Sequence, residues 1–269
     1  MNAIAQVFEK LNARGEGALI GYVMAGDPKP EQTPLIAEAL IEVGVDILEL
    51  GLPFSDPIAD GPTIQAASVR ALAAGTTPPM VLEMALEIKS KHITPIVVMT
   101  YYNPVFKMGL DRFFSLAKSC GVDGLIVPDL PVEEAADYRE KALISGVDTV
   151  FLAAPSTSAE RLQKIVACTS GFLYLVSHFG VTGERTRVED STIQLIKRVL
   201  PFTKRRVPLA VGFGVSKPQH ARSIIDAGAD GVIVGSVFVN VIQKNQGNPR
   251  AIVDEIGRLA QGFKAAMTR

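Results

Sequence analysis

Two carboxylates, Glu49 and Asp60, are the residues of this chain whose type and spacing could carry chemistry. Glu49 lies in the apolar run 46–50, which has the length of a β-strand. Because side chains alternate along a strand, Glu49 shares the face of Ile47 and Gly51, and that face should be buried. An unpaired buried carboxylate is unfavourable, so its pKa rises or it binds a partner. A carboxyl group in that state can both give and take a proton.

The loop after this strand can hold the second carboxylate over the first. Three prolines, two aspartates and one glycine fall within residues 53–62, so neither a strand nor a helix continues through them. The alternative is structural: Glu49 forms a salt bridge at a strand end, and Asp60 caps a helix that starts near Pro62. Two carboxylates at the carboxyl end of one strand favour the functional interpretation.

Composition limits the class of protein. The chain has 269 residues, of which 48% are hydrophobic, with 23 Gly and 17 Pro, so it is globular and can fill a large core. A formal net charge of -1 and a pI near 6.3 give no sign of a nucleic acid or an anionic membrane as a partner.

The remaining composition signals concern compartment and metals. Cys120 and Cys168 are far apart and the three histidines are scattered, so neither a disulfide framework nor a metal site is expected. Residues 1–10 lack the apolar core of a signal peptide, and no apolar run approaches the roughly 20 residues that span a bilayer. We therefore expect a cytoplasmic protein.

Eight apolar strands alternate with helices, which is the pattern of one (β/α)8 TIM barrel over residues 1–269. The strands are predicted at 18–24, 46–50, 95–101, 124–128, 148–153, 172–177, 208–212 and 231–235. The helices are predicted at 4–11, an extra one at the N-terminus, and at 31–43, 64–74, 80–91, 110–119, 133–144, 159–168, 191–199, 218–227 and 249–264. A doubly wound open sheet is the alternative, because counting strands cannot prove closure.

A Gly-x-Asp sequence recurs where a helix leads into a strand. It stands at 44–46, 121–123, 146–148 and 228–230. Glycine in the left-handed conformation would end each helix, and the chain would then enter an apolar strand. The first two repeats are 77 residues apart over two strand-to-strand intervals, which indicates inserted active-site loops around residues 53–62.

Three glycine-rich turns, at 179–183, 212–216 and 235–236, follow the last three strands. Glycines let backbone N–H groups approach an anion, and a following helix adds its positive end. Barrels often hold phosphate between the seventh and eighth loops, so these turns predict a phosphorylated substrate. No Lys lies in a predicted strand, and no Walker motif or catalytic triad is found, which leaves acid–base chemistry by carboxylates.

The segment from Glu49 to Gln65 closely resembles the signature of the tryptophan synthase alpha chain family. The resemblance continues in the right order through the motifs at 101–104, 128–131, 154–157, 180–183, 212–214 and 235–236. It implies a (β/α)8 barrel that is a lyase of tryptophan biosynthesis, cleaving indole-3-glycerol phosphate to indole and glyceraldehyde 3-phosphate by a retro-aldol reaction. It also implies that Glu49 delivers a proton to indole C3 and removes one from the side-chain hydroxyl, while Asp60 faces the indole nitrogen.

The resemblance implies further substrate contacts. The phosphate would lie among Gly183, Gly212, Phe213, Gly214, Gly235 and Ser236. The apolar indole pocket would consist of Tyr22, Met99, Tyr101, Ile126 and Ile233, for which an ordinary barrel core is the competing interpretation. Tyr174 would lie beside Glu49 near the glycerol chain, and Thr182 on the loop 178–190 would close over the site and contact Asp60.

Two features depart from the family pattern. His178 and Phe179 precede the Gly-Val-Thr-Gly motif where other residues are usual. Position 22 is Tyr where Phe is usual, and this adds a hydroxyl that must find a partner. The departures concern the loop and the detail of the indole pocket, and the reaction is unaffected.

The resemblance also implies a partner, a pyridoxal phosphate-dependent tryptophan synthase beta chain in an α2β2 complex. The loop 53–62 would dock on that partner through Pro53, Asp56 and Pro57, and this chain would need no cofactor of its own. Two alternatives remain: a free-standing indole-3-glycerol phosphate lyase, and a non-catalytic barrel that activates a beta chain. Retention of both Glu49 and Asp60 argues against the second alternative.

Overall fold

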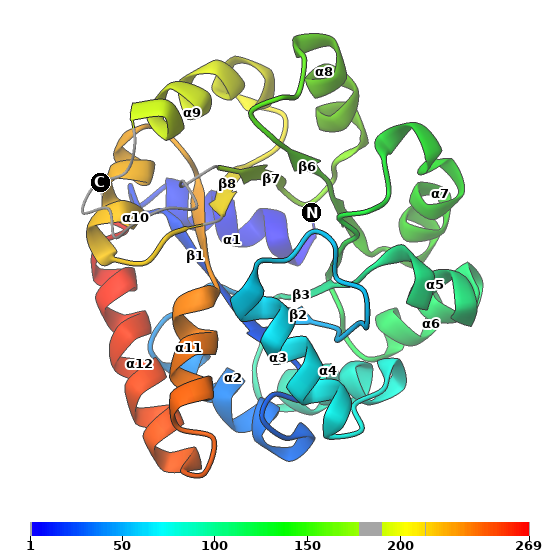
Figure 1. Cartoon of the computed structure of the whole chain (residues 1–269). Helices are drawn as coiled ribbons and strands as arrows, with labels where there is room; N and C mark the ends of the chain where they lie inside the picture. The colour runs from blue at the N-terminus through cyan, green and yellow to red at the C-terminus, as the bar shows by residue number, and fades with distance from the viewer. Residues whose placement is uncertain (1, 178–189, 213, 269) are drawn as a thin grey trace.

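One sheet of parallel strands forms the centre of the molecule, and helices surround it (Figure 1). The computed structural model describes residues 2–177, 190–212 and 214–268. The strands are β1 (Ala18–Met24), β2 (Ile47–Gly51), β3 (Ile96–Met99), β4 (Gly124–Ile126), β5 (Asp148–Val150), β6 (Leu152–Ala153), β7 (Leu173–Val176), β8 (Leu209–Gly212) and β9 (Gly231–Val234). Their order across the sheet is β5-β4-β3-β2-β1-β9-β8-β7-β6.

Helices fill the connections between the strands. They are α1 (Ala3–Asn12), α2 (Thr33–Glu42), α3 (Pro62–Ala73), α4 (Pro78–Lys91), α5 (Tyr102–Met108), α6 (Leu110–Ser119), α7 (Ala136–Ser145), α8 (Ala159–Cys168), α9 (Asp190–Thr203), α10 (Pro218–Asp226), α11 (Ser236–Lys244) and α12 (Pro249–Ala265), with two 3-10 turns, η1 (Pro30–Gln32) and η2 (Val132–Glu134). No helix within these described ranges is long and apolar enough to cross a membrane.

The sheet closes on itself at the segment 148–153, which the sequence predicts as one strand. Its first piece, β5, pairs with β4, and its second piece, β6, pairs with β7. Between the two pieces, the carbonyl of Phe151 accepts a hydrogen bond from the Tyr174 N–H at 3.0 Å. The two ends of the strand order are therefore successive parts of one segment. The barrel prediction is confirmed, and the open doubly wound sheet is wrong.

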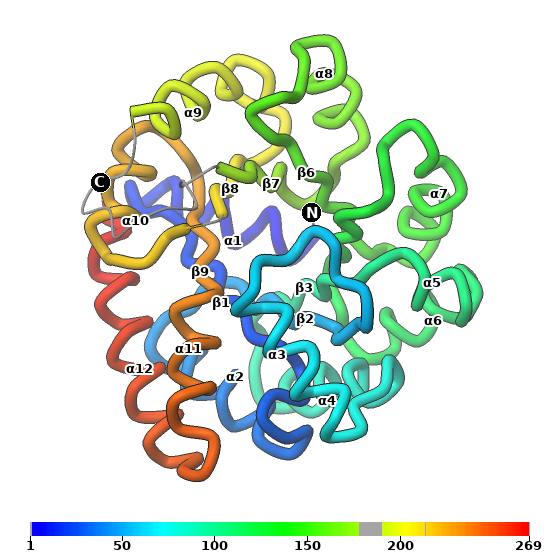
Figure 2. Tube along the Cα trace, viewed as in Figure 1, coloured from blue at the N-terminus to red at the C-terminus, as the bar shows by residue number. Residues whose placement is uncertain are grey.

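Alternation along each strand separates two cores. Leu48 and Leu50 of β2 face the layer between the sheet and the helices, whereas Ile47 belongs to the cluster inside the ring. That inner cluster also contains the buried Phe8 of α1, whose ring lies 6.0 Å from that of Phe172. The extra N-terminal helix predicted from the sequence therefore covers one opening of the ring, as the blue segment of Figure 2 shows.

The repeated Gly-x-Asp sequence makes the predicted turns and adds hydrogen bonds between strands. Its glycines have positive φ angles, at Gly44 (101°), Gly121 (78°), Gly146 (63°) and Gly228 (105°). Three of its aspartates accept the N–H of a residue on the neighbouring strand: Asp46 from Leu19 (2.8 Å), Asp123 from Ile96 (2.9 Å) and Asp230 from Leu209 (2.8 Å). These bonds hold the strands in register at the amino end of the ring, away from Glu49.

Two helices, α5 and α11, are missed by the sequence prediction, and the predicted strand 95–101 stops at Met99. The first turn of α5 depends on a distant residue, because the Tyr102 N–H donates to Asp129 Oδ1 at 2.9 Å. The helix α11 begins directly after β9, with Gly235 as its N-cap, so no loop composition marks its start. Both errors arise where local pattern carries no signal and tertiary contacts decide.

Asp123→Ala is expected to lower the free energy of unfolding by about 1–3 kcal/mol, because it leaves a buried backbone N–H of Ile96 without an acceptor. The substitution also removes the ion pair of Asp123 with Lys89 (2.9 Å). Urea unfolding measures the effect, and the exposed Asp137→Ala, with an expected change within about 0.5 kcal/mol, is the control. Equal stabilities of the two variants would show that the repeat has no role in strand pairing.

Candidate active site

Glu49 lies inside the ring, and no described residue forms a hydrogen bond or an ion pair with its carboxyl group. Only 1% of the residue is exposed, and its Oε2 is shut off from solvent without a hydrogen bond to any described residue. Its neighbours in strand register are Tyr22 on β1 and Val97 on β3. Burial first, and the charge of Asp60 second, raise the pKa of Glu49 to about 8. Glu49 is therefore mostly a neutral acid at pH 7.

Asp60 ends the loop between β2 and α3, and it is partly buried. Burial raises the pKa of Asp60 to about 6, while hydrogen bonding to the Tyr101 hydroxyl lowers it. The loop around Asp60 is held by two more hydrogen bonds: Ala59 N–H donates to the Tyr101 hydroxyl at 3.0 Å, and Gln65 Nε2 donates to the Asp60 carbonyl at 2.9 Å. At pH 7 Asp60 is mostly ionised, whereas Glu49 is mostly protonated.

Among the described residues, the contacts do not support the structural interpretation of the two carboxylates. The N-cap of α3 is Gly61, and no side chain caps that helix end, so Asp60 is not a cap. Glu49 makes no ion pair with any cation of the described segments. The pair is therefore available for proton transfer.

Two tyrosine hydroxyls flank the carboxyl pair, and they explain why two neighbouring positions are occupied by glycine. A Cβ atom on Gly51 would overlap the Tyr22 hydroxyl, and one on Gly212 would overlap the Tyr174 hydroxyl. Burial, and then the charges of Glu49 and Asp60, raise the pKa of Tyr22 and of Tyr174 well above the ordinary value. Both phenols consequently stay neutral and can donate a hydrogen bond beside the two carboxyls. Gly212, predicted as a phosphate contact, thus also has a packing role.

The five residues predicted to form the indole pocket point into the ring or lie at its mouth. Ile126 and Ile233 belong to the inner cluster, and Met99 packs against it. Tyr22 and Tyr101 are 5% and 3% exposed. The same placement would serve a ligand pocket and an ordinary barrel core, so their role in binding stays a prediction.

The hydroxyl of Tyr22, the unusual residue at its position, finds a weak partner. It lies 3.9 Å from the Met24 sulfur, which is its hydrogen-bond partner within the ring. A thioether is a poor acceptor, so this contact satisfies the hydroxyl only in part.

The glycine-rich turns after β8 and β9 lie at the same end of the ring as Glu49, because parallel strands end together. Gly214 is exposed with a φ of 74°, and Ser236 is the exposed first residue of α11. The first N–H groups of an α-helix have no intrahelical acceptor, so Gly235 and Ser236 lie where an anion can be bound. Three other predicted contacts, Thr182, Gly183 and Phe213, lie outside the described residues, as does most of the loop 178–190.

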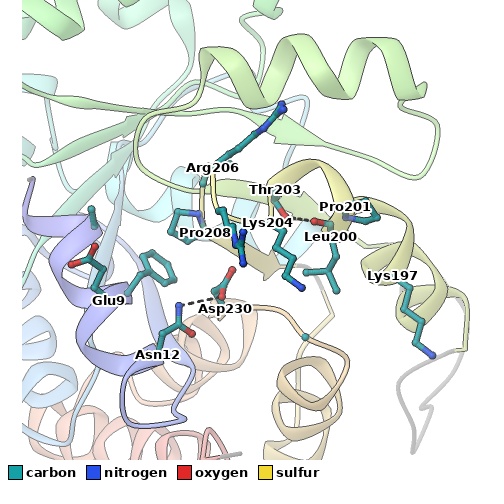
Figure 3. Close-up of a pocket in the computed structure, with 15 residues that line it drawn as sticks. Glu9, Asn12, Lys197, Leu200, Pro201, Thr203, Lys204, Arg206, Pro208 and Asp230 are labelled. Atoms are coloured by element: carbon teal, nitrogen blue, oxygen red, sulfur yellow. Dashed lines mark hydrogen bonds between the residues drawn. The ribbon is translucent and has the colours of Figure 1, made fainter.

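The cavity of about 990 Å³ shown in Figure 3 opens at the opposite end of the ring. Lys197 and Lys204 line it on one side, and Glu9 and Asp230 line it on the other. None of the residues singled out for catalysis or substrate binding reaches it, so it is separate from the carboxyl pair. No group of three or more His, Cys, Asp or Glu side chains within residues 2–177, 190–212 and 214–268 could hold a metal ion.

Two residues that hold the site, Ser68 and Asp129, are missing from the sequence prediction. The hydroxyl of Ser68 binds the backbone of Phe54, fourteen residues away, and Asp129 accepts the N–H of Tyr102. Asp129 stands in one of the motifs that carry the family resemblance, which is a signal that could have pointed to it. Ser68 has no comparable signal, because a single serine on a helix predicts nothing by itself.

The fold and the site together define a (β/α)8 barrel with a neutral and an ionised carboxyl at the carboxyl end of the strands. Residues 8–268 match the family model described as Tryptophan synthase alpha chain. The chain belongs to this family. Its members are the lyase subunits of tryptophan biosynthesis, so the lyase predicted from the sequence is confirmed.

Individual relatives agree over nearly the whole chain. The tryptophan synthase alpha chain of Methanosarcina acetivorans is 49% identical over 264 residues, covering 98% of this chain and 93% of that protein. A crystal structure of tryptophan synthase subunit alpha from Legionella pneumophila is 35% identical with a TM-score of 0.91, covering 99% and 98% of the two chains. A chain in a structure of the tryptophan synthase α2β2 complex from Pyrococcus furiosus is 42% identical with a TM-score of 0.87, covering 93% and 98%.

Glu49→Gln is expected to remove a pH-dependent loss of stability. The folded-state pKa of Glu49, about 8, lies above its ordinary value of 4.5, so the folded state holds this proton more tightly than the unfolded state. This contribution is complete below about pH 4.5 and is lost as the pH rises through about 8. The free energy of unfolding of the wild type is therefore expected to fall relative to that of E49Q across this window.

Urea unfolding of both proteins at about pH 5, 7 and 9 measures this difference. The exposed Glu140→Gln is the matched control, for which no such divergence from the wild type is expected. Parallel curves for the wild type and E49Q would mean that Glu49 is not an uncompensated buried acid.

Proposed function

We propose that this chain cleaves indole-3-glycerol phosphate to indole and glyceraldehyde 3-phosphate, with Glu49 and Asp60 as its catalytic pair. One observation carries the proposal: the two carboxyls are buried to different extents at one end of the barrel, which separates their pKa values, to about 8 and about 6. Cleavage of the bond to indole C3 needs an acid at that carbon, a base for the side-chain hydroxyl and an anion at the indole nitrogen. A neutral and an ionised carboxyl on one barrel end meet these needs.

Glu49 gives and takes a proton in turn. In its neutral form it protonates indole C3, which places a positive charge on the indole ring. The carboxylate so formed removes the proton of the hydroxyl on the adjacent side-chain carbon. The bond between C3 and that carbon then breaks, its electrons return to the ring, and the aldehyde forms. Glu49 ends protonated, as it began, so the cycle needs no other acid.

Asp60 stabilises the charged intermediate. Its ionised carboxylate accepts a hydrogen bond from the indole N–H, whose acidity increases when C3 is protonated. The Tyr101 hydroxyl holds that carboxylate in its ionised form by hydrogen bonding. An oriented anion in a partly buried site stabilises positive charge more strongly than water does.

The phosphate of the substrate is anchored opposite the carboxyl pair. Gly212, Gly214, Gly235 and Ser236 support this assignment through their position at the ends of β8 and β9 and at the start of α11. Gly183 and Phe213 complete the anchor in this proposal, Thr182 closes over the site, and Tyr174 contacts the glycerol chain. Binding at the remote phosphate orients the reacting bond between the two carboxyls.

A beta chain is the proposed partner, and the pyridoxal phosphate belongs to it. The structure of the α2β2 complex from Pyrococcus furiosus supports this, since it contains a relative of this chain. On this chain, the loop 53–62 exposes Ile58 (82%), and Phe106 (69%) lies on α5. A hollow of about 450 Å³ is lined by Pro53, Phe54, Asn103 and Pro104 of these two elements, among others.

Exposed apolar side chains around such a hollow are typical of a protein interface. Pro53, Asp56 and Pro57 are the proposed contacts on the loop. We place the complex in the cytoplasm, where the reaction supplies indole to the partner.

Glu49→Gln is expected to abolish cleavage and Asp60→Asn to lower kcat by a factor of about 10² to 10⁴, as for positioned acid–base groups. Release of glyceraldehyde 3-phosphate from indole-3-glycerol phosphate measures the rate, and circular dichroism verifies folding. The kcat/KM of the wild type is expected to decline on the acid side as Asp60 becomes protonated, near its pKa of about 6. Near-normal cleavage by a folded E49Q would refute the assignment.

Ile58→Asp is expected to weaken binding of the beta chain by at least about tenfold, because it places a charge in the apolar interface. Ile93→Asp, at a residue that is 97% exposed outside this interface, is the matched control with unchanged affinity. Titration calorimetry with the cognate beta chain measures both variants. Cleavage with and without that chain completes the test, and a full rate without it would favour the free-standing lyase.

A further inference from the structure

We propose that Ser68 is a positioning residue for Asp60, acting through Phe54 and Tyr101 rather than by contact. The inference rests on the proposed catalytic role of Asp60 and adds to it the residues that hold this carboxylate in place. Ser68 lies on α3, Phe54 and Asp60 lie near the two ends of the loop 53–62, and Tyr101 is the N-cap of α5, just after β3. The first two links are hydrogen bonds and a ring contact, and the third is the hydrogen bond from Ala59, the residue before Asp60, to the Tyr101 hydroxyl.

The first link joins Ser68 to the backbone of Phe54. Ser68 is 1% exposed, and its hydroxyl accepts the Phe54 N–H at 2.8 Å and donates to the Phe54 carbonyl at 2.8 Å. One hydroxyl thus satisfies both backbone polar groups of one residue, as a neighbouring strand would. The adjacent Ala67 and Ala71 of α3 are fully buried, so no other polar side chain of that face replaces it. The start of the loop is therefore fixed to α3 at Phe54.

The second link joins the side chain of Phe54 to Tyr101. The two rings are stacked, with centroids 5.3 Å apart and planes inclined by 27°. Such aromatic pairs have a preferred geometry, so the position of one ring restricts the other. Because Ser68 holds the Phe54 backbone, the Phe54 ring that stacks on Tyr101 is also held in place.

The third link joins Tyr101 to Asp60. The Tyr101 hydroxyl accepts the N–H of Ala59, the residue before Asp60, at 3.0 Å. Its interaction with the Asp60 carboxylate lowers the pKa that burial raises. On the other side of Tyr101, the Tyr102 N–H donates to Asp129 Oδ1 at 2.9 Å. Tyr101 is thus held between the stacked Phe54 ring and the start of α5, with its hydroxyl directed at the end of the loop.

The helix that carries Ser68 is itself anchored. Arg70 of α3 makes two hydrogen bonds to Asp27, each of 2.7 Å, and the Asp27 side chain is fully buried. Asp27 lies just beyond the end of β1, so this ion pair holds α3 against the strands of the barrel. A bidentate Arg–carboxylate pair fixes orientation as well as distance. Because α3 is fixed to the barrel in this way, the hydrogen bonds of Ser68 fix the start of the loop 53–62 relative to the barrel.

The expected consequence of breaking the first link is a change in the acid–base behaviour of Asp60. Without the Ser68 hydroxyl, the Phe54 peptide loses two hydrogen bonds and its ring is free to leave Tyr101. The Tyr101 hydroxyl then binds Asp60 less completely, and the effective pKa of Asp60 rises because burial is less opposed. In a plot of kcat/KM for cleavage against pH, the decline on the acid side (the acid limb) should therefore move to higher pH.

The test compares Ser68→Ala with Ser68→Thr, which keeps a hydroxyl, in the full-length chain saturated with the beta chain. The kcat/KM for cleavage of indole-3-glycerol phosphate is measured against pH, with Tyr101→Phe as the reference for complete loss of the hydrogen bond. S68A is expected to lower kcat/KM by about tenfold at neutral pH and to shift the acid limb in the same direction as Y101F. S68T is expected to retain the wild-type limb.

Thr149→Val controls for the loss of a buried hydroxyl as such. Thr149 is 4% exposed, and its hydroxyl donates to the Cys168 carbonyl at 2.9 Å near the start of β5, at the other end of the barrel. T149V is expected to lose stability without moving the acid limb. If S68A does not fold, Phe54→Leu tests the second link instead, because it keeps the backbone bonds to Ser68 and removes the ring stacking.

The outcomes separate this inference from the proposed function. A folded S68A or F54L with the wild-type rate and acid limb would overturn the positioning role, while an impaired Asp60→Asn would leave the catalytic role of Asp60 standing. A shift of the acid limb in T149V equal to that in S68A would overturn it as well. Full activity of Asp60→Asn would instead refute the proposed function, in which Asp60 is one of the two catalytic residues.

Discussion

The burial of one carboxyl group, that of Glu49, is the constraint on which the rest of the site depends. Inside a closed ring of strands it meets no cation and no hydrogen-bond donor of the described residues, so its charged form is unfavourable and it stays protonated at neutral pH. Burial also raises the pKa of Asp60, but by less, because the interaction with Tyr101 opposes it. Two identical functional groups thereby become an acid and an anion, and the phenols of Tyr22 and Tyr174 stay neutral beside them.

The barrel separates stability from chemistry by placing them at its two ends. At the amino end, α1 covers the opening, and three of the four aspartates of the repeated turns accept strand N–H groups, so these backbone groups are paired. At the carboxyl end, Glu49 has no partner among the described residues, and glycines make room for the tyrosine hydroxyls. Such an unsatisfied site can exist because the paired end and the inner core hold the ring together.

The sequence was sufficient to predict features that depend on local periodicity. Alternation around Ile47 and Glu49 placed the acid inside the ring, and the glycines before Asp46 and Asp123 marked real helix ends. Features that depend on contacts distant in sequence were missed. These are the hydrogen bond to Asp129 at the start of α5, the division of the strand 148–153 into two, and the hydrogen bonds between Ser68 and the Phe54 backbone. The roles of the phosphate turns, the indole pocket and the docking loop remain predictions, because a position at the right end of a barrel suits more than one purpose.

The most direct test of this account is the protonation state of Glu49 itself. Infrared difference spectra of the wild type minus E49Q, with carbon-13-labelled glutamate, isolate the carbonyl band of this one carboxyl group. We expect the band of the protonated acid at pH 7 and its replacement by carboxylate bands around the pKa of about 8. A spectrum that already shows only the carboxylate of Glu49 at pH 7 would contradict the account, because the chain would then lack the acid that we propose to protonate indole C3.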